Sequence, residues 1–146
     1  MSFFDSLSIA ASGLQAERTR MDVTSENLAN AQTTSGANGL PYQRQEVVLE
    51  QVGGNSFGTT LAGAMSNSAP PGGVEVAGIV NDPTPDQLVY DPGHPGANAA
   101  GYVSMPNVNP VTEMTDLIDE SDSYQADVTA MSTAKTMFAK TLDLLK

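Results

Sequence analysis

The stretch LIDESDSYQADVTAMSTAKTMFAKTLDLL, residues 117–145, repeats apolar residues at alternating spacings of four and three positions. This is the period of a coiled-coil seam, in which apolar residues face a partner helix. Ser121 and Lys135 are the polar exceptions in this seam, whose apolar positions are Leu117, Tyr124, Val128, Met131, Phe138, Leu142 and Leu145. Because the Asn-Pro pair at 109–110 is a strong helix start, the sequence predicts a helix from about residue 110 to about residue 145.

A second apolar line lies near the start of the chain. It recurs at every seventh residue and consists of Leu7, Leu14, Met21 and Leu28. This repeat predicts a helix from about residue 3 to about residue 31, which a cluster of Gly, Asn, Thr and Pro residues then ends. Many Ser and Thr residues lower its helix propensity, so the helix should be marginal alone in water. We expect its apolar line to pack against the seam of the C-terminal helix.

The middle of the chain has β composition interrupted by flexible segments. Strands are predicted at residues 42–52, 74–80 and 88–90, and a Gly/Ser/Pro-rich loop at about residues 53–73. The predicted fold class is α+β, with long terminal helices paired as an antiparallel coiled-coil-like α-domain and a small β-rich central domain. The helical domain comprises residues 1–35 and 108–146, and the β-rich module comprises residues 36–107.

The charge of the 146-residue chain limits its partners. Seventeen acidic and six basic residues give a net charge of −11, which opposes binding to phosphate backbones or anionic lipids. We therefore expect no nucleic-acid partner. Since no apolar run approaches about 20 residues, we also expect no direct membrane insertion. The N-terminus lacks the features of a secretory signal peptide, so the protein is expected to be cytoplasmic or exported without a cleaved signal.

No residue pattern predicts an enzyme, a cofactor site or a metal site. The chain has no cysteine, and its one histidine, His94, lies in the turn-forming sequence DPGHPG without a nucleophile nearby. The glycines match neither the P-loop nor the dinucleotide-binding fingerprint. Catalytic, cofactor-binding and metal-binding residues are therefore all predicted to be absent.

Acidic residues crowd the first half of the C-terminal helix. They are Glu113, Asp116, Asp119, Glu120, Asp122 and Asp127. Several are like-charged helical neighbours that repel each other. Two interpretations stay open, because the acids could form a solvated face or could meet a basic surface on another subunit.

The stretch SENLANAQT, residues 25–33, resembles the N-terminal signature of bacterial flagellar axial proteins, which form the rod, hook and hook junction. The residues of this signature that we single out are Ser25, Asn27, Leu28, Asn30 and Thr33. Three further stretches, 40–49, 73–80 and 90–110, together with the chain length, resemble the proximal rod members of that family. The resemblance covers essentially the whole chain.

This resemblance implies a non-enzymatic structural subunit of the basal-body proximal rod, the periplasmic drive shaft that transmits torque for motility. Such subunits are exported through the flagellar type III apparatus without a cleaved signal. They polymerise helically with their own copies and other rod subunits, next to inner-membrane ring and rod-adaptor proteins. The family's terminal helices are typically disordered in the free subunit and pair on assembly.

The predicted assembly interface combines both apolar lines: Leu7, Leu14, Met21, Leu28, Leu117, Tyr124, Val128, Met131, Phe138, Leu142 and Leu145. Two alternatives to a proximal rod subunit remain open at this point. One is another flagellar axial subunit of the rod or hook, and the other is a secreted helical binding module with helices that are ordered in the monomer.

Overall fold

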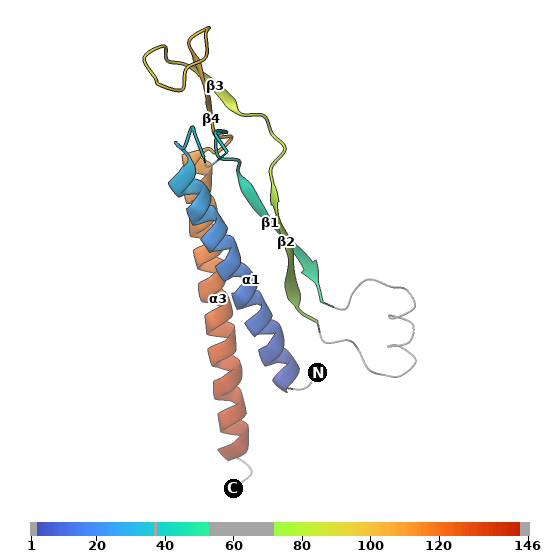
Figure 1. Cartoon of the computed structure of the whole chain (residues 1–146). Coiled ribbons are helices and arrows are strands. Elements are labelled where there is room, and N and C mark those ends of the chain that lie inside the picture. Colours follow the sequence, from blue (N-terminus) through green and yellow to red (C-terminus); the bar gives the residue numbers. More distant parts are fainter. Residues whose placement is uncertain (1–2, 37, 53–71, 144–146) are drawn as a thin grey trace, which may run out of the picture. The chain divides into compact units, whose positions relative to one another are not determined.

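The structure is a computed structural model that describes residues 3–36, 38–52 and 72–143. Most of the loop predicted at residues 53–73 therefore lies outside the described residues. Figure 1 labels the elements in chain order: α1 (Phe3–Asn30), β1 (Gln45–Gln51), β2 (Val74–Asn81), β3 (Gln87–Tyr90), β4 (Tyr102–Met105) and α3 (Pro110–Asp143). Two helices and two small sheets confirm the predicted α+β class.

Helix α3 begins where the Asn-Pro pair predicts. The side-chain Oδ1 of Asn109 accepts a hydrogen bond from the Val111 amide at 3.0 Å, and its carbonyl accepts one from the Glu113 amide at 3.0 Å. The cap satisfies an amide at the helix start that has no partner within the helix. Pro110 occupies the first helical position, where a missing N–H costs no bond.

Strands β1 and β2 form one two-stranded sheet. At one end the Asp82 amide donates to the Arg44 carbonyl at 2.8 Å, and at the other the Val52 amide donates to the Gly73 carbonyl at 3.0 Å, which makes the pair antiparallel. The strand predicted from residue 42 begins only at Gln45. The reason is that the amides of residues 42 and 44 bond outside the sheet, to the Thr33 carbonyl and the Asn107 side chain.

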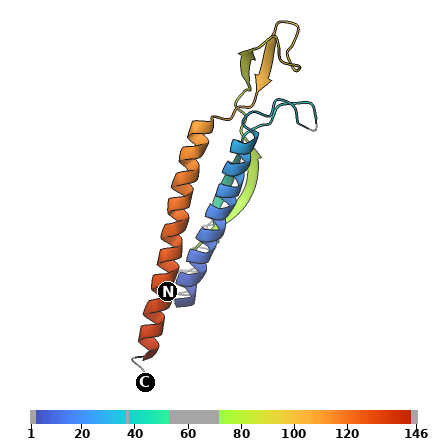
Figure 2. The same ribbon diagram turned by 90° about the vertical axis from the view of Figure 1, so that its left-hand side faces the viewer.

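Strands β3 and β4 form a second antiparallel sheet, a hairpin visible in Figures 1 and 2. The register pairs Tyr90 with Tyr102, and their rings meet edge to face with centroids 5.3 Å apart. Gly101 precedes β4 with a φ of 82°, a left-handed conformation that favours glycine. Strand β4 was not predicted, whereas its equally short partner β3 was predicted at residues 88–90.

The chain divides into two compact units. One, here called the junction unit, comprises residues 20–47 and 79–120; the other, the terminal unit, comprises residues 1–19, 48–78 and 121–146. Among the described residues, the buried apolar side chains of the junction unit are Val23, Val103, Pro106 and Val108, and that of the terminal unit is Ala16. The described part of the junction unit therefore holds a small apolar core, whereas that of the terminal unit has a single buried apolar side chain. The predicted helical and β-rich domains follow a different division and remain a prediction about the assembled protein.

Candidate functional site

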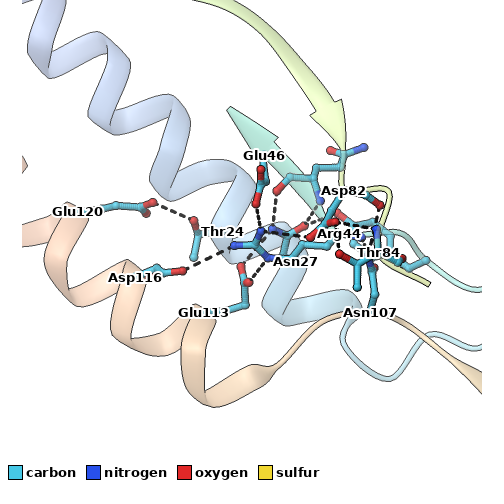
Figure 3. A network of polar contacts seen from close by, with 12 residues as sticks. Thr24, Asn27, Arg44, Glu46, Asp82, Thr84, Asn107, Glu113, Asp116 and Glu120 are labelled. Carbon is cyan, nitrogen blue, oxygen red and sulfur yellow. Dashed lines mark hydrogen bonds and ion pairs between the residues drawn. The ribbon is translucent and has the colours of Figure 1, made fainter. Parts of the chain in front are cut away.

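A buried cluster of polar side chains joins α1, β1 and α3 within the junction unit. We call its members the Asn27 cluster: Asn27, Arg44, Asn107 and Glu113, which Figure 3 labels, together with Tyr42. Asn27 and Glu113 are each only 1% exposed. Buried polar groups of this kind stabilise a fold only when they are hydrogen-bonded, so their partners decide what the cluster does.

Asn27 bonds three segments of the chain through its amide group. Its Nδ2 donates to the Gln45 carbonyl at 2.8 Å and to Glu113 Oε2 at 3.1 Å. Its Oδ1 accepts from the Gln45 amide at 2.9 Å and from the Tyr42 hydroxyl at 2.9 Å. The side chain thus makes four hydrogen bonds, and it pairs with β1 as a neighbouring strand would.

The Tyr42 hydroxyl is held in its protonated form. Burial raises the pKa of Tyr42, and the nearby carboxylates of Glu26 and Glu113 raise this pKa further. The neutral hydroxyl is therefore available as a donor to Asn27 at any pH below the usual tyrosine range.

Arg44 gathers four carboxylates around one guanidinium group (Figure 3). Its Nε donates to Glu113 Oε1 at 2.6 Å, and its Nη1 pairs with Glu46. Asp82 and Asp116 lie farther away, each with a nitrogen-to-oxygen distance of 3.7 Å. The guanidinium group therefore supplies the positive charge among these four acids, and it compensates the buried negative charge of Glu113.

The pKa of Arg44 follows from these contacts. Burial alone would lower it, but the hydrogen bond and charge of Glu113, together with those of Glu46, raise the pKa of Arg44 above its usual value. The guanidinium is consequently charged throughout the pH range in which the protein is folded.

Asn107 ties the cluster to the segment that follows β2. Its Oδ1 accepts from the Arg44 amide at 2.8 Å, and its Nδ2 donates to the Thr84 carbonyl at 3.1 Å. Asp82 in turn accepts from both the hydroxyl and the amide of Thr84, at 2.5 and 2.8 Å. These two bonds, with a smaller contribution from Arg44, hold the pKa of Asp82 below its usual 3.8 even though burial opposes the shift.

A second polar contact joins the two helices in the junction unit. Glu120 is 4% exposed, and its Oε1 accepts from the Thr24 hydroxyl at 3.0 Å and lies 3.6 Å from Arg20 Nε. In the terminal unit, a Cβ added at Gly13 would lie 2.7 Å from Asp127 Oδ2, so Asp127 also approaches α1 closely.

These contacts correct the two interpretations offered for the acids of the C-terminal helix. Glu113 and Glu120 are buried within the chain, so they belong neither to a solvated face nor to a surface awaiting another subunit. Asp119 and Asp122 are exposed, and for them both interpretations remain open.

The signature residues lie at or near the end of α1. Asn27 is buried at the centre of the cluster, whereas Ser25 is exposed. Asn30 donates to the Glu26 carbonyl at 2.9 Å and accepts from the Thr33 hydroxyl at 3.2 Å, so both residues shape the turn that leaves the helix. Leu28 is half-buried.

The residues predicted to form the assembly interface are half-buried or exposed in the single chain. Val128, Phe138 and Leu142 are 42%, 37% and 48% exposed. Leu145 lies outside the described residues. The half-buried members are Leu7, Leu14, Met21, Leu28, Leu117, Tyr124 and Met131. Their pairing in the assembled protein remains a prediction.

The sequence patterns did not predict the roles of Arg44, Asn107, Glu113 and Glu120. One signal was present in the sequence, because Arg44 is the only lysine or arginine between residues 21 and 134. A single cation among many acids is a candidate for a structural ion pair. Its partner could not be predicted, because Glu113 lies 69 residues away along the chain.

His94 has the structural role expected of a turn residue. Its Nδ1 accepts from the Gly96 amide at 3.0 Å, within the connection between β3 and β4.

In the part of the chain that the structure describes, no group of three His, Cys, Asp or Glu residues is placed to hold a metal ion. Neither α1 nor α3, as far as the structure describes them, contains an apolar stretch of the length that a membrane-spanning helix needs.

Replacing Asn27 tests the cluster directly. Asn27→Leu keeps the branched shape of the side chain but leaves Tyr42, Glu113 and both backbone groups of Gln45 without this partner, and each such buried group costs about 1–3 kcal/mol. We expect the free energy of unfolding, measured by urea titration with circular dichroism, to fall by at least about 3 kcal/mol. Ser25→Ala is the control, within about 0.5 kcal/mol of the parent. Equal stability of the two variants would contradict the role of Asn27.

Replacing Thr84 tests the pKa of Asp82. A lowered carboxyl pKa contributes stability above pH 3.8, and this stability is lost as the pH falls through the lowered pKa. Thr84→Val removes the hydroxyl donor, so the variant should be less stable than the parent at pH 6, and the difference should shrink below pH 3.8. Thr84→Ser should behave as the parent. An unchanged Asp82 pKa in an NMR titration of Thr84→Val would contradict this assignment.

Comparison with known proteins matches both ends of the chain to flagellar rod families. Residues 7–37 match the family described as "Flagella basal body rod protein". Residues 99–144 match the family described as "Flagellar basal body rod FlgEFG protein C-terminal". The two matched segments contain α1 from Leu7 onward and all of α3.

Relatives with similarity along the whole chain carry a more specific description. A Bacillus subtilis protein described as "Flagellar basal-body rod protein FlgC" is 48% identical over the full length of both chains. Proteins of the same description from Yersinia enterocolitica and Salmonella typhimurium are 41% and 39% identical, over 99% of this chain and 98% of each relative. With such identity over the full length, the chain belongs to the FlgC family of flagellar basal-body rod proteins.

Proposed function

We propose that this chain is a structural subunit of the proximal rod of the bacterial flagellar basal body. In this role it polymerises helically with its own copies and with other rod subunits, and the resulting shaft transmits torque. Membership in a family of rod proteins supports a structural role and argues against an enzyme. The observation that carries the proposal is the full-length similarity to proteins described as rod subunits, found together with a chain that leaves its apolar surface uncovered.

Uncovered apolar surface is what a polymerising subunit needs. Hydrophobic residues make up 40% of the sequence, yet among the described residues the buried apolar side chains are one alanine and three valines. Large exposed side chains occur on both helical and strand elements and include Leu88, Tyr90, Val111, Ile118, Val128 and Met137. Burying such surface between subunits supplies the free energy for association.

The Asn27 cluster supports the mechanical part of this proposal. A drive shaft must pass torque from its helical parts to its β elements without yielding at the connection. In the junction unit, Asn27 of α1 bonds both β1 and α3, and Arg44, the residue before β1, bonds α3, through four buried or part-buried hydrogen bonds, of which the two to Glu113 are charge-assisted. Such bonds are short, directional and rigid, so they resist rotation of the strand against the helices.

In the assembled rod we propose that the terminal helices pair as a coiled coil. Residues 1–35 and 108–146 would form the inner α-domain near the rod axis, and residues 36–107 would form the outer β-rich module. The half-buried Leu14 and the exposed Val128 belong to the two apolar lines that this pairing would cover. These helices have low intrinsic stability, and their apolar residues would be removed from water only when the helices pack in the rod. Both properties are expected of a subunit that assembles after export.

The export route of the subunit and its neighbours in the cell envelope follow from the same proposal. The subunit would pass through the flagellar type III export apparatus without a cleaved signal and would assemble in the periplasm. There it would contact inner-membrane ring and rod-adaptor proteins in addition to other rod subunits. The net charge of −11 supports protein partners over nucleic acid or anionic lipid.

Introducing a charge into the seam tests the proposed assembly. Val128 is exposed in the single chain, so Val128→Asp should leave the monomer folded and normally expressed. In an assembled seam the buried aspartate would be costly, so swimming in soft agar should fall to the level of a strain that lacks the gene. Leu14→Asp should have the same effect on swimming.

The matched control is Ser123→Asp, which adds the same charge at an exposed position of α3 outside the predicted seam. It should swim as the parent does. Normal swimming of the Val128→Asp strain would contradict the coiled-coil seam, whereas full motility of a strain that lacks the gene would contradict the rod function itself.

A further inference from the structure

Helix α3 carries an exposed apolar ridge near its N-terminal end. Val111, Met114 and Ile118 are 67%, 46% and 62% exposed. Their spacing of three and four residues places them side by side on the helix surface. Two exposed acids, Asp119 and Asp122, follow the ridge. We call Val111, Met114 and Ile118 the ridge.

The C-terminal half of α3 has the complementary shape and carries a lysine beyond its far end. A shallow groove of about 760 Å³ runs along the helix; Asp122 and Gln125 line its N-terminal end, and the rest is lined by Ala126, Thr129, Ala130, Thr133, Ala134 and Met137. Apart from Met137, these side chains are small, so another helix can approach the backbone closely. The exposed Lys140 lies one turn beyond Met137. We call this surface the groove.

We propose that the ridge of one copy docks in the groove of the next copy, with the two α3 helices parallel. This proposal rests on the rod function and names a contact by which copies of the subunit associate. Two observations select a second copy as the occupant. The large ridge side chains match the small groove side chains, and the acids beside the ridge match the lysine beside the groove.

Charge pairing fixes the register of this contact. Placing Asp122 of one copy opposite Lys140 of the other requires an offset of 18 residues along α3. The same offset brings Val111, Met114 and Ile118 level with residues 129, 132 and 136, which lie within the span of the groove. At 1.5 Å per residue, consecutive copies would be displaced by about 27 Å along the helix.

An antiparallel orientation of the two α3 helices is inconsistent with the positions of the same residues. If the helices were antiparallel with the ridge in the groove, Asp119 and Asp122 would lie over the acidic end of the groove, which contains Asp122 itself. If Asp122 were instead placed opposite Lys140, the ridge would extend past the end of α3 at Asp143. Only the parallel arrangement satisfies both shape and charge.

A parallel, offset contact has consequences for assembly. It joins two different surfaces of the same chain and is therefore heterologous. Contacts of this kind repeat in one direction and build open helical filaments unless the rotation closes a ring. The ridge and the groove thus supply a polar contact suited to the growth of a rod.

Disulfide cross-linking tests the register, and the absence of native cysteines makes the result unambiguous. The variant Asp122→Cys/Lys140→Cys is expressed in a strain that lacks its own gene, and its basal bodies are purified and oxidised. We expect a ladder of linked dimers and higher multimers on a non-reducing gel. Asp122→Cys/Ser132→Cys is the control, because residue 132 lies about 12 Å short of the proposed register and a disulfide requires Cα atoms within about 7 Å.

The outcomes separate this inference from the proposed function. Basal bodies that contain the subunit but show no link between residues 122 and 140, or show equal linkage in the control, would overturn the ridge and groove contact while leaving the rod function in place. Absence of the unsubstituted chain from basal bodies would overturn the rod function.

Filling the groove provides an independent test. Ala130→Leu occupies the groove with a larger side chain, while Ala139→Leu makes the same change at an exposed position outside it. We expect swimming to be lost in the first variant and retained in the second. Equal swimming of the two strains would overturn the proposal.

A photo-reactive residue in place of Ala130 identifies the occupant by mass spectrometry of the cross-linked rods. Linkage to residues 111–122 of another copy supports the proposal. Linkage to a different rod subunit, or to α1, would overturn it.

Discussion

The bond between Arg44 and Glu113 is the interaction on which the junction unit depends. Glu113 is 1% exposed, and burying a carboxylate without a cation would cost several kcal/mol. Its Oε1 bonds Arg44 at 2.6 Å and its Oε2 bonds Asn27 at 3.1 Å, so both oxygens have partners. Through these two residues, one buried acid on α3 fixes the position of β1 and the end of α1. The apolar core is too small to do this by packing alone.

Two kinds of interaction have different roles in this structure. Polar contacts within the chain set the geometry at the junction, where directional hydrogen bonds specify a single structure. Apolar surfaces on α3 remain exposed and are available to other subunits. A rod subunit needs both, because it must be correctly shaped before assembly and still carry enough uncovered surface to join a polymer.

The sequence predicted the helices well and the cluster poorly, and the reason is physical. Heptad spacing and the Asn109–Pro110 start are local signals, so the predicted ends of α1 and α3 lie close to those observed. The signature residue Asn27 was also singled out, although its partners were not. Contacts such as the one between Arg44 and Glu113 join segments 69 residues apart and leave no periodic trace. The acids of α3 were misjudged for this reason, since the same residue type serves as a solvated charge and as a buried hydrogen-bond acceptor.

Amide hydrogen exchange of the dilute chain, compared with the assembled rod, tests the central claim most directly. The Gln45 amide bonds the buried Asn27 side chain, so it should exchange slowly already in the free chain. Amides in the C-terminal half of α3, where Val128 and Met137 are exposed, should exchange quickly in the free chain and become protected only in the rod. A free chain in which Gln45 exchanges as fast as residues 128–142, or in which all of α3 is protected equally, would contradict the account.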